Sequence, residues 1–441
     1  MNRYSGKKRT PRRRRSLSVP TAAAAALVMA TTACGGGSSA DGEAVELRFS
    51  WWGADDRHAT LQEVIEVFEE ENPGIRIAGD YTDWDSYWDR LATSTAANDA
   101  PDIIMQEERY LREYGDRGAL VDLGEFEDTL DLSGLDPLVA ESGDLDGQTF
   151  GIATGVNAYA VLADPEAFEE AGVDMPDDEN WTWDDYVEVA TAITEGSDEE
   201  LVGVQSMAYN ESGFQIFARQ HGENLYEEDG SLAFSEETLA EWFQVTSDLL
   251  EDGGQPSAAE SVEIEAGGPD QSVLATNQGA MAHFWTNQLG GITESSGREL
   301  ELLRYPGETE NERTGMYFKP AMFYSVNSGS DHPEEAVRFV DFMVNSEEAA
   351  ELNLSDLGLP ANEEVREHIL DDLPEADERS AAFMDEIGDS IVDGNPPPPI
   401  GAGEVVEITK RITDEMSFGE LTPEEAAEQF TAEVEAATGG E

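Results

Sequence analysis

The chain has 441 residues, of which 96 are acidic and 25 basic, and its formal net charge at pH 7 is −71. Nucleic-acid binding is excluded because it needs clustered Lys and Arg against phosphates, whereas Lys319 and Lys410 are the only lysines after Cys34. Cys34 is the only cysteine, which excludes an intrachain disulfide, and a chain of this length with 39% hydrophobic residues is long enough for two domains with buried cores.

The first 33 residues have the pattern of a secretory leader. Eight basic residues lie within the first fifteen, no acidic residue accompanies them, and the apolar stretch Thr21–Ala33 follows. This stretch is shorter than the ~20 residues that a lasting transmembrane helix needs. We therefore predict that residues 1–33 are a signal peptide that is removed, which lowers the net charge from −71 to −79.

Cys34 follows Thr32 and Ala33 and precedes three glycines. This order resembles the lipobox of bacterial lipoproteins, although Thr31 stands where that motif usually has Leu. The resemblance implies that Cys34 receives a diacylglycerol, that residues 34–44 form a lipid-anchored linker, and that the protein is held on the extracytoplasmic face of the cell membrane. The alternative is a free thiol just after the cleavage site.

The first half of the chain alternates strands with helices. Val45–Trp52 is rich in strand-forming residues, and apolar residues then recur at helical spacing from Leu61 to Phe68, until Asn72-Pro73-Gly74 ends the helix. The next expected elements are a strand over 75–81, a helix over 86–97 and a strand over 102–105. This alternation predicts a parallel sheet covered by helices.

A second α/β unit is expected farther along the chain. Its predicted elements are an extended segment over 149–163, helices over 183–194 and 236–250, and strands over 201–207, 279–285 and 317–326. The C-terminal part is mostly helical, and Pro396–Pro399 interrupts it with a stiff extended segment because proline cannot continue a helix. The predicted fold class is therefore α/β.

Motifs for catalysis are missing from the sequence. The five histidines never pair at a spacing of four, and no Gly-x-Ser-x-Gly elbow or glycine-rich nucleotide loop follows a strand. With 96 acidic residues, pairs of carboxylates occur by chance, so no glycosidase pair stands out. We predict no catalytic residue, no metal site and no cofactor.

Aromatic residues beside polar ones mark a candidate binding site. Trp51 and Trp52 end the first strand, and ligands of open α/β sheets bind at the carboxyl ends of strands. A sugar ring, with its apolar face and its hydroxyl perimeter, is bound by stacking rings and planar polar groups. The candidate ligand-binding residues are Trp51, Trp52, Asp55, Arg57, Trp84, Gln106, Glu107, Asn157, Tyr209, Asn210 and Trp285. For each aromatic residue, packing in the core is the alternative.

Four segments together resemble family 1 extracellular solute-binding proteins, the maltose-binding-protein-like lipoproteins of sugar ABC importers. The segments are Phe68-Glu69-Glu70-Glu71-Asn72-Pro73-Gly74-Ile75, Ala100-Pro101-Asp102-Ile103-Ile104, Gly279-Ala280-Met281 leading to Trp285, and His332-Pro333-Glu334-Glu335-Ala336 leading to Phe342. The order of these segments covers nearly the whole chain after the leader. The family's Gly-Pro-Trp is replaced here by His283-Phe284-Trp285.

The resemblance implies a two-lobed, periplasmic-binding-protein-like (type II) fold with the ligand between the lobes. Lobe I is expected to hold residues 45–157 and 284–322, and lobe II residues 158–283 and 323–441. The crossings between lobes are expected near Asn157, Phe284 and Phe323. The family pattern places polar ligand contacts at Gln106, Glu107 and Asn157, a stacking ring at Trp285, a further contact at Phe323 and a cleft loop near Ile400.

The resulting hypothesis is a monomeric, lipid-anchored subunit that captures a sugar, with an oligosaccharide favoured because aromatic residues recur at several strand ends. It would deliver the sugar to an ABC permease and ATPase encoded elsewhere. The first alternative is an exported, polysaccharide-active glycoside hydrolase, and the second is a binding protein for another solute such as a peptide or a polyol. The negative charge disfavours anionic ligands, unless a local arginine such as Arg57 reverses it.

Overall fold

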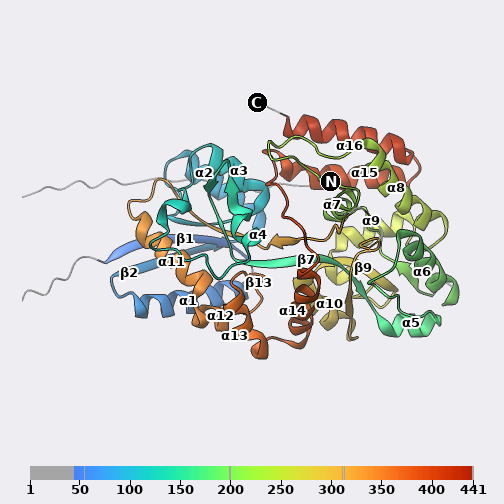
Figure 1. Ribbon diagram of the computed structural model, residues 1–441, viewed down its shortest axis with the longest axis horizontal. Helices are drawn as coiled ribbons and strands as arrows, with labels where there is room; N and C mark the ends of the chain where they lie inside the picture. Colours follow the sequence, from blue (N-terminus) through green and yellow to red (C-terminus); the bar gives the residue numbers. More distant parts are fainter. Residues whose placement is uncertain (1–43, 54, 198–199, 310, 312, 440–441) are drawn as a thin grey trace, which may run out of the picture. The chain divides into compact units, whose positions relative to one another are not determined.

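Two large β-sheets with helices around them dominate the described chain (Figure 1), and β4 (Asp144–Leu145) and β5 (Gln148–Thr149) form a small third sheet. The computed structural model describes residues 44–53, 55–197, 200–309, 311 and 313–439, so the predicted signal peptide and Cys34 lie outside the described residues. The described residues from 44 to 439 belong to one compact unit. None of the described helices is long and apolar enough to cross a membrane.

The first sheet has the strand order β2-β1-β3-β12-β6. Its strands are β1 (Val45–Trp52), β2 (Ile75–Thr82), β3 (Ile103–Gln106), β6 (Ile152–Ala153) and β12 (Phe323–Val326). The first three are parallel, as the alternation of strands and helices predicts, and β12 runs antiparallel to β3 and β6. The covering helices are α1 (Asp55–Glu71), α2 (Trp84–Ala96), α11 (Pro333–Asn345), α12 (Glu347–Asn353) and α13 (Glu363–Ile369).

Aromatic rings fill the core between this sheet and its helices. Phe49 of β1 lies 5.4 Å from Phe339 of α11, measured between ring centroids, and Phe68 of α1 lies 5.0 Å from Phe339. All three rings are fully buried. Edge-to-face pairs of this kind stabilise a core beyond the area that they bury. The helical spacing of apolar residues in α1 therefore turns one face of the helix toward the sheet.

The second sheet has the strand order β10-β7-β9-β8. Its strands are β7 (Gly155–Ala163), β8 (Val202–Val204), β9 (Gly279–Trp285) and β10 (Glu301–Leu303). Every residue of β7 is buried, as expected for a central strand with both faces covered. The surrounding helices are α5 (Pro165–Ala171), α6 (Trp183–Gly196), α7 (Glu211–Gln220), α8 (Glu236–Glu251), α9 (Ala258–Gly267), α10 (Leu289–Ser296), α14 (Glu375–Gly388), α15 (Val405–Ser417) and α16 (Pro423–Thr438).

The pairing of three later strands, β9, β10 and β12, differs from the expected division of the chain into lobes. Residues 284–322 were assigned to the first lobe, yet β9 and β10 pair with β7 in the second sheet. Residues 323–441 were assigned to the second lobe, yet β12 pairs with β3 in the first. The physical reason is that the apolar run over 317–326 is two strands, β11 (Phe318–Pro320) and β12, with the change of sheet between them.

Three backbone segments cross between the sheets near the start of β7. They are the connection from β6 to β7, the connection from β11 to β12, and β13 (Leu359–Pro360), which together with β11 pairs with the start of β7. A β-carbon on Gly155 would lie 2.6 Å from the carbonyl carbon of Gly358, so two of these backbones touch in a way that only glycine permits. The expected crossing near Phe284 is wrong, because Phe284 pairs with Ala160 inside the second sheet.

Candidate functional site

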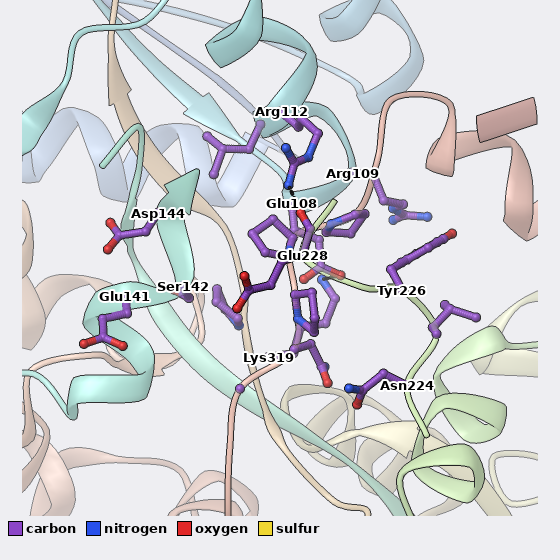
Figure 2. A pocket seen from close by; sticks show the side chains of 18 of the residues that line it. Glu108, Arg109, Arg112, Glu141, Ser142, Asp144, Asn224, Tyr226, Glu228 and Lys319 are labelled. Atoms are coloured by element: carbon purple, nitrogen blue, oxygen red, sulfur yellow. Dashed lines mark hydrogen bonds and ion pairs between the residues drawn. The ribbon is translucent and has the colours of Figure 1, made fainter. Parts of the chain in front are cut away.

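A cavity of about 600 Å³ lies where the crossing segments meet, and elements that pack on both sheets line it. From the side of the first sheet come α3 (Glu108–Asp116), α4 (Pro137–Ala140) and residues 141–147. From the side of the second come the start of α7, residues 224–228 and residues 391–398, and β11 passes between them. Figure 2 shows polar and charged side chains from these segments around the cavity.

A buried group of charges stands at the base of α3. Glu107 caps this helix by accepting a hydrogen bond from the Arg109 amide, and its carboxylate lies 3.0 Å from Arg109 Nε. Lys319 of β11 places Nζ 3.4 Å from Glu107 and 3.1 Å from Glu108. Lys319 thereby links the crossing strand to the helix that lines the cavity.

Burial and pairing set the ionisation of this group. Burial by itself would raise the pKa of Glu107, but the charges of Lys319 and Arg109 and the hydrogen bonds from Arg109 lower it below the ordinary value. For Glu108, burial dominates, and its pKa is raised despite the attraction of Lys319. Burial opposes the charge of Lys319, yet the two carboxylates raise its pKa. The carboxylates are thus largely compensated inside the protein.

Trp285 reaches this group from the end of β9. Its half-buried ring lies 5.6 Å from Lys319 Nζ, in the geometry of a cation–π contact, and 4.9 Å from the ring of Tyr159. Asn157, another predicted contact, is buried in β7 directly opposite Lys319 in the strand register. Glu107, Asn157 and Trp285 therefore gather around Lys319, although none of the three lines the cavity itself.

Two arginines hold the wall of the cavity formed by residues 393–395. Arg219 of α7 is fully buried, lies 2.6 Å from Asp393 Oδ1, and donates to Asn395 Oδ1 at 2.9 Å. Arg313 lies 2.6 Å from Asp393 Oδ2 and donates to Asn224 Oδ1 at 2.8 Å. These bonds fix both Asn224 and the segment that leads into Pro396–Pro398.

Several predicted ligand contacts have other roles in the structure. Trp51 is fully buried, and its ring lies 5.5 Å from that of His58 and 6.3 Å from that of Tyr81, so its predicted place at the ligand is wrong. The strand turns this ring toward α1 because side chains alternate between the faces of a sheet. Phe323 is likewise buried, inside the first sheet, opposite Gln106. Both residues pack in the core, which is the alternative given above for the aromatic candidates.

Other predicted residues are engaged in local contacts. Arg57 forms a 2.7 Å ion pair with Asp356, and Asp55 accepts a hydrogen bond from Tyr81. Tyr209 donates to Asp414, and Asn210 caps α7. These bonds occupy the polar groups that were expected to face a ligand.

Trp52 packs in a cluster of rings next to α2. The other members of the cluster are Trp84, Tyr87 and Trp88, with Trp88 stacked on Tyr110 of α3 at 3.9 Å. Trp84 is 36% exposed, which leaves part of its ring open to a ligand. Gln106 is fully buried, and neither of its side-chain polar atoms has a partner within the described residues. The ligand role of Trp84, Gln106 and Trp285 remains a prediction.

None of the single residues predicted as ligand contacts lines the cavity, whereas Arg109, Arg112, Tyr226 and Lys319 do. Pro396–Pro398 also line it, next to the cleft loop expected near Ile400. Two signals in the sequence point to part of this set. Lys319 is one of only two lysines after Cys34, and Arg109 and Arg112 follow the predicted third strand at helical spacing. The segment over 224–228 carries no such signal, because only the tertiary fold brings it to the cavity.

Comparisons with known proteins agree with the fold. A putative binding protein of Brucella abortus is 25% identical over 340 residues, which span 74% of this chain and 78% of that protein. An arabinooligosaccharide-binding protein of Halalkalibacterium halodurans is 34% identical over 123 residues, which span 26% of this chain and 27% of that protein.

A solved structure gives the same architecture. The periplasmic oligogalacturonide-binding protein of Yersinia enterocolitica superposes with a TM-score of 0.75 at 22% sequence identity, covering 89% of this chain and 98% of that one. The described chain therefore has the two-lobed fold of periplasmic solute-binding proteins. The family model of bacterial extracellular solute-binding proteins matches residues 63–381, well over half of the sequence. The chain belongs to the bacterial extracellular solute-binding protein family.

Proposed function

We propose that this protein captures a sugar, with an oligosaccharide favoured, in the cavity at the crossing segments and delivers it to the permease of an ABC importer. The observation that carries the proposal is the cavity itself, because elements from both sheets line it. Its volume of about 600 Å³ lies within the range of ~300–1,000 Å³ that is usual for small-molecule sites. A solute there would touch both halves of the molecule at once.

The lining of the cavity suits a polyhydroxylated ligand. Ser142, Asn224 and Tyr226 offer hydrogen-bonding groups, and Phe318 with Pro396–Pro398 offers apolar surface. The names of two similar proteins support this chemistry, since one binds arabinooligosaccharides and the other oligogalacturonides. A sugar needs both kinds of contact, one for its hydroxyl groups and one for the C–H face of its ring.

Capture would work by stabilising the closed arrangement. Arg112 of α3 donates a 3.2 Å hydrogen bond to the carbonyl oxygen of Glu228, which joins the two walls of the cavity (Figure 2). A ligand that binds both walls shifts the population toward closure by its difference in affinity for the closed and open states. The closed, loaded form would then be the one that the permease recognises.

The test is a thermal-shift and calorimetric screen of the protein without residues 1–33 against a panel of oligosaccharides. At least one sugar should raise the melting temperature, since a ligand at one hundred times its Kd stabilises by ~2.7 kcal/mol. Chromatography after long incubation should recover every sugar intact. Absence of any shift would contradict sugar capture, and cleavage of a sugar would support the glycoside hydrolase instead.

The membrane tether is a separate part of the proposal. Lipidation of Cys34 would keep the binding protein beside its permease through a linker that lies before the first strand. In the producing cell, Cys34→Ser should move the protein from the membrane fraction into the soluble fraction and lower its mass by the lipid. A membrane-bound Cys34→Ser protein of unchanged mass would contradict the tether, while sugar capture would be unaffected.

A further inference from the structure

The cationic side chains of this acidic protein are mostly neutralised by carboxylates, and Arg112 is an exception in the cavity. Among the three cations that line the cavity, Arg109 is paired with Glu107, and Lys319 with Glu107 and Glu108. Within the described residues, no carboxylate lies within 4.0 Å of the Arg112 guanidinium. The cavity therefore contains one positive charge without a counter-ion.

The hydrogen bonds of Arg112 are also incomplete. Its Nη2 donates to the Glu228 carbonyl oxygen at 3.2 Å, while its Nε is buried and has no acceptor among the described residues. A guanidinium carries five N–H donors in a planar fork that matches the two oxygens of a carboxylate. Leaving a buried donor unpaired is unfavourable, so an acceptor group on the ligand that bonded to Arg112 Nε would remove this cost.

Carboxylates also line the cavity, and several of them have partners. Asp393 is held by Arg219 and Arg313, Glu108 is paired with Lys319, and Asp144 accepts a hydrogen bond from Thr149. Glu211 stands in the first turn of α7, where a helix N-terminus favours a negative charge. Although burial opposes it, the charges of Glu107 and Glu211 raise the pKa of Arg109. Of the three cations that line the cavity, Arg112 alone has no ion pair with a carboxylate among the described residues.

We infer that the sugar is acidic, and that Arg112 binds its carboxylate. This inference rests on the proposed function of sugar capture. Arg57, the arginine suggested by the sequence, is paired with Asp356, whereas Arg112 has no carboxylate partner among the described residues, and its Nε has no acceptor there. A uronic acid residue, which adds one carboxylate to an otherwise neutral ring, has the required chemistry.

The exposed rim gives this binding an unusual dependence on salt. Glu141, Asp146 and Glu228 are exposed carboxylates along the cavity, and they repel an approaching anion over distances longer than a direct contact. Added salt shortens the reach of such repulsion from ~10 Å at 0.1 M to ~3 Å at 1 M, while a buried contact is screened much less. The affinity for an acidic sugar therefore rises with salt, whereas exposed ion pairs weaken with salt.

The test compares an oligogalacturonide with its methyl ester, which keeps the rings and removes the charge. By calorimetry in 1 M sodium chloride, the acid should bind the wild-type protein at least tenfold more tightly than the ester. Arg112→Gln loses the wall-joining bond to Glu228 for both ligands, so it should weaken the acid at least tenfold more than it weakens the ester, and Arg112→Lys should fall between. The acid should bind more tightly in 1 M than in 0.1 M salt.

Arg117→Gln is the matched control. Arg117 follows the same helix but is exposed, paired with Glu113 and outside the cavity, so its loss should change neither affinity. Melting temperatures of all variants identify any that fail to fold. Equal binding of acid and ester, or an acid affinity unchanged by Arg112→Gln, would overturn the inference and leave sugar capture standing. Failure of every acidic and neutral oligosaccharide to bind would overturn both.

Discussion

At the residue scale, His283 is a buried imidazole held between two tyrosines. Its Nε2 lies 2.6 Å from the Tyr186 hydroxyl and its Nδ1 lies 2.7 Å from the Tyr305 hydroxyl. Burial lowers the pKa of His283 from 6.5 to about 3. The folded protein thus holds the neutral ring, with one nitrogen donating and the other accepting a hydrogen bond.

This histidine predicts a loss of stability in acid. Between pH 6.5 and about 3 the unfolded chain binds a proton at this residue that the folded chain does not, so the free energy of unfolding falls as pH falls, by at most ~1.4 kcal/mol per pH unit. Denaturant titrations at several pH values should show a shallower acid slope for His283→Gln than for the wild-type protein. Parallel slopes would refute the assignment.

His368 is the control for this experiment. It is exposed and lies 2.9 Å from Glu351, whose hydrogen bond raises the pKa of His368. Its contribution is therefore present at low pH and is lost as pH rises through the raised pKa, which is the opposite sign. His368→Gln should leave the acid slope of the wild-type protein intact.

Two tryptophans should separate core packing from ligand contact. Trp51→Ala empties a fully buried site, and such truncations destabilise by ~3–5 kcal/mol. Trp285→Ala removes the half-buried ring that contacts Lys319, a residue of the cavity wall, so it should weaken sugar binding by roughly threefold to tenfold with a smaller loss of melting temperature. Calorimetry and thermal unfolding of both variants provide the comparison. If Trp285→Ala bound the sugar with wild-type affinity, Trp285 would have no role in ligand binding.

At the element scale, the segment over 393–398 depends on two arginines for its position against the cavity. Arg219 is fully buried and Arg313 is partly exposed, and both bind Asp393. Loss of either arginine leaves Asp393 with the other as its counter-ion. Loss of Arg219 also leaves the Gly315 carbonyl oxygen and Asn395 Oδ1 without their donor, at a fully buried site.

Arg313→Gln should therefore loosen the wall of the cavity without unfolding the protein. We expect a loss of sugar affinity of roughly threefold to tenfold, because Asn224 and Asp393 each lose a bond. Arg219→Gln should lower the melting temperature by more than Arg313→Gln does. Unchanged affinity in Arg313→Gln, measured by calorimetry, would mean that this wall does not touch the ligand.

The elements show which parts of the fold could be predicted from sequence. The strands and helices from Val45 to Gln106 follow local periodicity, and the predicted parallel pairing is confirmed. The pairing of Phe323–Val326 with the first sheet was missed because the apolar run itself does not indicate which strand it will pair with. The ring of Trp51 was misplaced for a related reason: a strand end with two adjacent tryptophans must point one of them into the core.

At the scale of the whole molecule, the net charge governs stability in salt. The chain after residue 33 carries a net charge of −79, and its carboxylates are spread over the sequence. Mutual repulsion destabilises the compact state, and ~1 M salt limits its reach to ~3 Å. The melting temperature should rise steadily from low salt to molar sodium chloride. A flat profile, with sucrose as the uncharged control for solution effects, would show that the fold already compensates its carboxylates.

The pairing of β12 with β3 also constrains how the chain reaches its native state. The two partners are separated by roughly 200 residues, so the first sheet stays incomplete until most of the polypeptide is available. Long-range pairing of this kind slows folding, since a large loop must close before its contacts form. A polypeptide synthesised from its N-terminus therefore keeps the β3 edge of this sheet unpaired until β12 has been made, and an unpaired edge of this kind is open to wrong strand pairing.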